Sequence, residues 1–88
     1  MDWTLLSTVI PPGEILTRNV KYYDRLVIIS EKGSGKYSYF QGSTRNCYHK
    51  KGKELKLNQP LTIPRGFTVK IHNYTQSDLI ISESLERY

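Results

Sequence analysis

Cys47 and His49 are the residues of this 88-residue chain whose types and spacing first suggest covalent chemistry. On a strand, residues two positions apart lie on the same face, and a thiolate beside an imidazolium is the arrangement that activates many cysteine nucleophiles. His72 is the one further histidine, whereas structural zinc needs four ligands and catalytic zinc needs three protein ligands. We therefore expect no enzyme, no metal site and no bound cofactor.

The eight acidic residues are scattered along the sequence and do not indicate a catalytic pair. Nearly all of them, Glu83 included, fall at expected turns or strand ends. Solvation and the protection of sheet edges explain carboxylates at such positions.

A glycine-rich segment, Gly33-Ser34-Gly35-Lys36, superficially resembles a phosphate-binding loop. The Walker pattern also requires a glycine separated by four residues from the Gly-Lys pair, a Ser or Thr after the pair, and a following helix. Tyr37 stands where the hydroxyl residue is needed, and a strand pattern follows. We interpret the segment as the turn of a hairpin.

The strongest charge feature is a basic region accompanied by tyrosines. Three interpretations of this region are open: a solvated edge and loop, a surface that binds an acidic protein, and a site for single-stranded nucleic acid. In the last case the basic side chains bind phosphates while the bases stack on the aromatic rings. The RNA-recognition motif of sheet proteins is absent. The candidate binding residues are Lys36, Tyr37, Tyr39, Arg45, Tyr48, His49, Lys50, Lys51, Lys53 and Lys56.

Length and composition point to one small domain. The formal net charge is +5, which favours encounters with anions without identifying one. A single cysteine rules out an internal disulfide, so packing and hydrogen bonds must hold the fold. Neither a signal peptide nor a membrane span is expected, because no apolar stretch is long enough. The expected location is the cytoplasm on synthesis.

Two similar phrases, Ile10-Pro11-Pro12-Gly13 and Ile63-Pro64-Arg65-Gly66, indicate how the chain turns. In each, a β-branched run meets a proline without an amide proton, and a glycine that tolerates positive φ follows. Each phrase predicts a strand, a tight turn and a second strand.

Short alternating or β-branched runs predict strands along the whole chain, and no helical periodicity is long enough for a stable helix. The fold class is therefore all-β: a small antiparallel β-sandwich, or a reduced jelly roll or barrel, of about seven or eight short strands. We expect one domain over residues 1–83 and a tail over 84–88, with the core at 26–29, Phe67, Val69, Ile71 and 79–81. The expected strands are 3–10, 15–20, 25–30, 37–41, 54–57, 61–63, 67–73 and 78–83, and residues 46–49 form either a further short strand or part of an ordered loop.

The segment from Leu57 to Asn73, LNQPLTIPRGFTVKIHN, resembles a phrase found in small β-sandwich and jelly-roll accessory proteins of viral and bacteriophage virions, where it builds an edge hairpin. It covers about a fifth of the chain. The resemblance implies an accessory virion role, such as capsid decoration, a vertex or a spike, with sheets that pack against copies of themselves.

These observations predict a non-enzymatic binding or assembly protein that associates with itself and with another protein. A short β domain without disulfides has a thin core and unpaired edges, and symmetric association remedies both. The alternative is a small regulatory or inhibitory protein that binds nucleic acid, or a nucleic-acid-binding protein, through the basic region 45–56.

Overall fold

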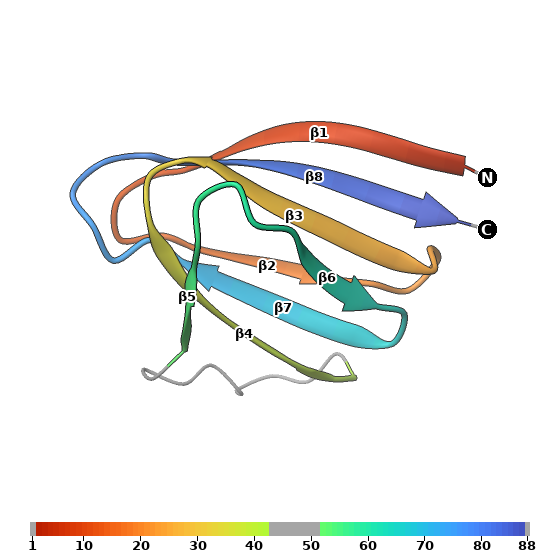
Figure 1. The fold of residues 1–88 in the computed structure, drawn as a ribbon. Helices are drawn as coiled ribbons and strands as arrows, with labels where there is room; N and C mark the ends of the chain where they lie inside the picture. Colours follow the sequence, from red (N-terminus) through yellow and green to blue (C-terminus); the bar gives the residue numbers. More distant parts are fainter. Residues whose placement is uncertain (1, 43–51, 88) are drawn as a thin grey trace.

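The computed structural model describes residues 2–42 and 52–87, and within them the chain forms an eight-stranded antiparallel β-sandwich (Figure 1). The predicted all-β class is confirmed. An expected short strand at 46–49 lies outside the described residues. The strands are β1 (Asp2–Ile10), β2 (Ile15–Asn19), β3 (Arg25–Lys32), β4 (Gly35–Gln41), β5 (Lys53–Leu55), β6 (Leu61–Pro64), β7 (Phe67–His72) and β8 (Leu79–Arg87).

The strand order follows one simple rule. One sheet, sheet A, has the order β1-β8-β3-β6, and the other, sheet B, has the order β2-β7-β4-β5. The first strand pairs with the eighth, the second with the seventh, the third with the sixth and the fourth with the fifth. A long antiparallel ribbon rolled into two layers produces this pairing, which is the winding of an eight-stranded jelly roll. The β3–β8 and β4–β7 ladders complete the two open sheets.

Both proline-glycine phrases turn the chain as predicted, but they carry it from one sheet to the other. Gly13 has φ 81° and Gly66 has φ 91°, values that favour glycine because it has no side chain. The first phrase joins β1 of sheet A to β2 of sheet B, and the second joins β6 of sheet A to β7 of sheet B. The edge hairpin that the resemblance implied for residues 57–73 is therefore wrong, because β6 and β7 lie in opposite sheets.

The predicted hairpin around residues 31–36 is also wrong for the same reason. β3 belongs to sheet A and β4 to sheet B, so the glycines carry a crossing between layers. Gly33 has φ 91°, and a Cβ there would lie 2.8 Å from the backbone oxygen of Asp78. The connection can pass this close to the start of β8 only because residue 33 has no side chain.

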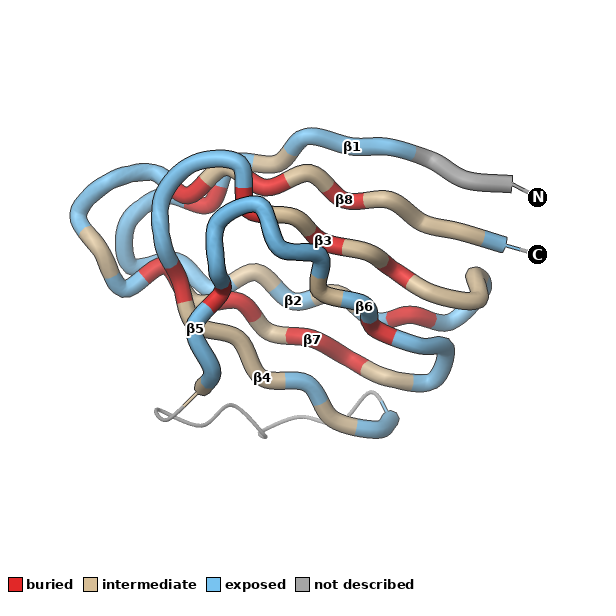
Figure 2. Tube along the Cα trace, viewed as in Figure 1, coloured by how far each residue is buried: buried red, intermediate tan, exposed pale blue. Residues whose placement is uncertain are grey.

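The core lies between the sheets, and its buried hydrophobic side chains are aliphatic. Figure 2 marks the buried positions in red along the strands of both sheets. β3 is a central strand of sheet A, as expected, but its apolar run alternates: Leu26 and Ile28 are buried, while Val27 and Ile29 are half-buried on the outer face. Ile80 and Phe67 are likewise only partly buried. The buried hydrophobic residues are Ile10, Val20, Leu26, Ile28, Leu55, Ile63, Val69, Ile71, Leu79 and Ile81.

The last strand is longer than the sequence indicated. β8 extends to Arg87 and pairs with β1 along all nine residues of both strands. Residues 84–87, expected to form a tail, therefore continue the central part of sheet A. The two ends of the described chain lie side by side (Figure 1).

Candidate functional site

A groove of about 320 Å³ opens between β4, β5 and the connection from β5 to β6. Asn58, with φ 60°, turns this connection, and its backbone N–H donates to the carbonyl of Ser30 at 2.9 Å. The connection is thereby fixed to β3 of the opposite sheet. The volume is within the range of small-molecule sites, which begins at about 300 Å³. We call this hollow the β4–β5 groove; it is lined by Tyr37, Lys53, Glu54, Leu55, Lys56, Gln59, Pro60 and Leu61.

Two lysines of the groove form no ion pair with any described residue. Lys53 and Lys56 are exposed, and neither forms an ion pair within residues 2–42 and 52–87. The Glu54 carboxylate is held elsewhere, because it accepts a hydrogen bond from the Tyr74 hydroxyl at 3.1 Å. An anion entering the groove would therefore meet two available ammonium groups.

A row of three aromatic rings continues from the groove along the inner face of sheet B. The Tyr37 and Tyr39 rings are stacked, with centroids 6.4 Å apart and an interplanar angle of 16°. The Phe67 ring follows at 5.8 Å from Tyr39, tilted by 59°. Tyr39 pairs with the buried Val69 and so shares its face, yet it is 45% exposed. Sheet A therefore leaves this part of β4 uncovered, and we call the three rings the aromatic row.

The structure brings some of the predicted candidate residues together and separates others. Tyr37, Lys53 and Lys56 line the groove, and Tyr39 joins them through its stacking on Tyr37. Lys36 lies on the outer face of sheet B, where its Nζ is 5.3 Å from the centroid of the Tyr74 ring. Five candidates lie outside the described residues, as does Cys47: Arg45, Tyr48, His49, Lys50 and Lys51.

A polar cluster around Tyr74 covers the outer face of the same sheet. The hydrogen bond from its hydroxyl to Glu54 raises the pKa of Tyr74 above the ordinary 10.0, and desolvation and the negative charge of Glu54 act in the same direction. The ring of His72 packs edge-on against Tyr74 with centroids 6.5 Å apart. Tyr74 therefore links Glu54 and His72 on the outer side of sheet B.

The second candidate surface is the free edge of β1 in sheet A. The strand is nine residues long, and from residue 3 to residue 10 it has no charged residue and no proline. Leu5, Leu6 and Val9 are 60%, 46% and 53% exposed. Register with β8 places Leu5 and Val9 on the outer face and Leu6 on the inner one. Long, apolar, uncharged edges are what proteins ordinarily avoid, because unpaired backbone groups there can pair with another chain.

The other three edges of the two sheets carry the usual protection. β6 has four residues and ends in Pro64, which cannot donate to a neighbouring strand. β5 has three residues and includes Lys53 and Glu54. β2 has five residues and includes Arg18. Sequence reasoning expected unpaired edges, but only the topology shows that β1 is the long unprotected one.

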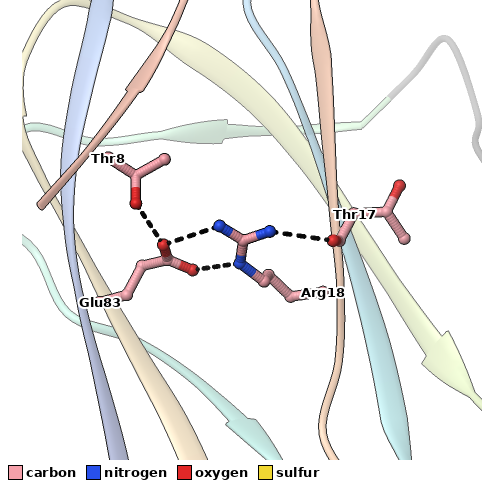
Figure 3. A network of polar contacts seen from close by, with 4 residues as sticks. All are labelled: Thr8, Thr17, Arg18 and Glu83. Carbon is pink, nitrogen blue, oxygen red and sulfur yellow. Dashed lines mark hydrogen bonds and ion pairs between the residues drawn. The ribbon is translucent and has the colours of Figure 1, made fainter. Parts of the chain in front are cut away.

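An ion pair between a partly exposed arginine and a buried carboxylate connects the sheets beside the β1 edge (Figure 3). Arg18 of β2 donates from Nε to Oε1 of Glu83 at 2.8 Å and from Nη2 to Oε2 at 3.2 Å, and the Thr8 hydroxyl of β1 donates to Oε2 at 2.6 Å. Glu83 is 1% exposed, so the prediction of a solvated strand-end carboxylate is wrong for this residue. The alternation of Leu79, Ile81 and Glu83 along β8 places all three on the inner face. This alternation in the sequence would have indicated that Glu83 is buried.

The described part of the chain contains no cluster of three or more His, Cys, Asp or Glu side chains suited to a metal ion. No helix long and apolar enough to cross a membrane occurs among the described residues. Comparison of the chain with protein-family models and with curated proteins found no match to either.

Proposed function

We propose that this protein is a non-enzymatic assembly component that associates with copies of itself through strand β1. The observation that carries the proposal is the unprotected nine-residue edge with its three exposed aliphatic side chains. Pairing with a second copy satisfies the free backbone groups of the edge and removes Leu5, Leu6 and Val9 from water, both of which stabilise association.

A two-fold arrangement fits this edge best. Two copies of β1 that run antiparallel bring the same patch of both chains together, which is a closed, self-complementary contact. Asp2 is the one charged residue of the strand, so pairing about the central Leu6 sets no like charges opposite each other. The two copies of sheet A then form one continuous eight-stranded sheet.

The jelly-roll winding supports an accessory role in a virion, with the protein made in the cytoplasm and incorporated during assembly. Jelly rolls build viral capsid proteins, although they also build lectins and cupins, so the fold supports the role by analogy. The resemblance of residues 57–73 to virion modules favours the first of these. Capsid decoration, a vertex or a spike are the roles in which such a module packs against copies of itself and against a second structural protein.

The test is the solution mass by light scattering on a sizing column at low and at high salt. We expect an oligomer whose mass persists in high salt, because the proposed contact is apolar and backbone-mediated. The double variant Leu5→Lys/Val9→Lys should be a folded monomer. Leu57→Lys serves as the matched control, because Leu57 is 53% exposed and lies away from β1.

The proposal is overturned if the wild-type chain is a monomer at both salt concentrations. It is equally overturned if the double variant keeps the wild-type mass. Thermal melting of each variant shows whether a change in mass comes from lost pairing or from unfolding.

A further inference from the structure

We infer that the β4–β5 groove and the aromatic row bind single-stranded nucleic acid, with unpaired bases stacked on Tyr39 and Tyr37 and phosphates bound by Lys53 and Lys56. This goes beyond self-assembly, because it uses sheet B and the opposite side of the sandwich from β1. The inference rests on the geometry of the rings, the charge of the lysines and the shape of the groove.

The rings are arranged as a stacking platform. Tyr37 and Tyr39 are stacked and nearly parallel at 16°, so a base can extend the stack on a free ring face. Tyr39 retains 45% of its surface exposed and is supported from the side by Phe67 at 5.8 Å. Each base that stacks on an aromatic ring contributes without regard to sequence, because every base has a π face. Rings held in place by neighbouring rings lose little freedom when a base arrives.

The lysines lie where the phosphates of a stacked strand would pass. Lys53 pairs with Tyr37 across the β4–β5 ladder, so the two side chains share the inner face. Lys56 lines the same groove three residues further along the chain. Since neither lysine has an ion-pair partner in the described residues, a phosphate gains the full interaction. The net charge of +5 adds a long-range attraction for a polyanion.

The shape of the site favours an unpaired strand over a duplex. The rings lie on the inner face of a sheet, beside a groove bounded by the β5–β6 connection. In a duplex the base faces are covered by neighbouring base pairs, whereas a single strand can turn its bases toward aromatic rings. An acidic peptide could use the two lysines but would leave the parallel ring faces without a matching partner.

The experiment is fluorescence anisotropy with four probes: a 12-residue oligo-dT, a 12-residue abasic oligonucleotide of equal charge, a 12-base-pair duplex and an oligoglutamate peptide. We expect oligo-dT to bind most tightly. Tyr39→Ala should weaken oligo-dT binding by about 5- to 100-fold, the loss typical of one base–ring stack. Tyr39→Phe should restore it, because the phenyl ring keeps the stacking face.

Salt dependence tests the lysines separately. The double variant Lys53→Gln/Lys56→Gln should reduce the slope of log affinity against log salt by about 1.4, which corresponds to two phosphate contacts on a single strand. Lys36→Gln makes the same chemical change on the outer face of the sheet and should leave oligo-dT affinity and slope close to wild type. Circular dichroism melting confirms that each variant is folded.

The inference is overturned if the abasic oligonucleotide or the duplex binds as tightly as oligo-dT, because stacking then contributes nothing. It is also overturned if oligoglutamate binds more tightly, which would indicate an acidic protein partner, or if folded Tyr39→Ala binds like wild type. The Leu5→Lys/Val9→Lys variant should still bind oligo-dT, so this inference and the assembly proposal succeed or fail independently.

Discussion

Replacing Arg18 with methionine removes one partner of the ion pair with the buried Glu83. Methionine keeps a long apolar stem in place of the arginine methylenes, so packing is largely preserved while the guanidinium is lost. Glu83 is 1% exposed and accepts three hydrogen bonds, of which only the one from the Thr8 hydroxyl would remain. A charged carboxylate would then be left in the sandwich with most of its hydrogen bonds missing.

The expected loss in the free energy of unfolding follows from how deeply each of the two side chains is buried. Removing one partner of a fully buried ion pair costs about 3–5 kcal/mol. The Arg18 side chain is 37% exposed while that of Glu83 is 2% exposed, so water can reach part of the carboxylate once the guanidinium is gone. We therefore expect a loss of about 2–3 kcal/mol in the free energy of unfolding. For a domain of this size each kcal/mol lowers Tm by about 4–8 °C.

The assay is urea unfolding followed by circular dichroism, with the free energy of unfolding extrapolated to water. Arg25→Met is the matched control, because Arg25 forms a 2.6 Å ion pair with Glu86 whose side chains are more exposed, at 43% and 20%. For this variant we expect the free energy of unfolding to fall by less than about 1 kcal/mol. The double variant Arg18→Met/Glu83→Met removes both charges and should regain most of the loss. An Arg18→Met cost no larger than that of Arg25→Met would refute the reasoning.

Two further predictions concern backbone strain and one shifted pKa. Gly33→Ala should lower the free energy of unfolding in urea more than Gly13→Ala. Both glycines have positive φ, which costs alanine about 1–2 kcal/mol, but only a Cβ at residue 33 would lie 2.8 Å from the Asp78 backbone oxygen. Equal losses in the two variants would contradict this close approach. Glu54→Gln should lower the pKa of Tyr74 toward 10.0, because the hydrogen bond to the carboxylate and its charge both raise it, and NMR titration of the Tyr74 ring carbons measures the change. The stability that the Tyr74–Glu54 hydrogen bond contributes is present below the ordinary tyrosine pKa and is lost as the pH rises through the raised pKa. If Tyr74 titrates identically in the variant and the wild type, Glu54 is not the cause of the raised pKa.

Local chemistry determined much of this protein. β-branched runs and alternation predicted where the described strands lie, to within a few residues for most of them, because side-chain preferences and the period of two act within a single strand. The prolines at 11 and 64 and the glycines two positions later predicted the turns that follow β1 and β6, because φ preferences are properties of single residues. The candidate groove was partly foreseen as well, since Tyr37, Lys53 and Lys56 were identified by residue type alone.

Tertiary structure decided which strands are neighbours. A tight turn is compatible with a hairpin within one sheet and with a crossing between two sheets, and nothing local distinguishes them; here β6 and β7 separate into opposite layers. The same choice places Lys36 on the outer face and Tyr39 beside the groove, buries Glu83 against Arg18, and leaves β1 as the long unprotected edge. Strand partners are set by the burial of apolar faces from segments far apart in the chain, such as β1 and β8, and so they emerge only when the whole sandwich closes.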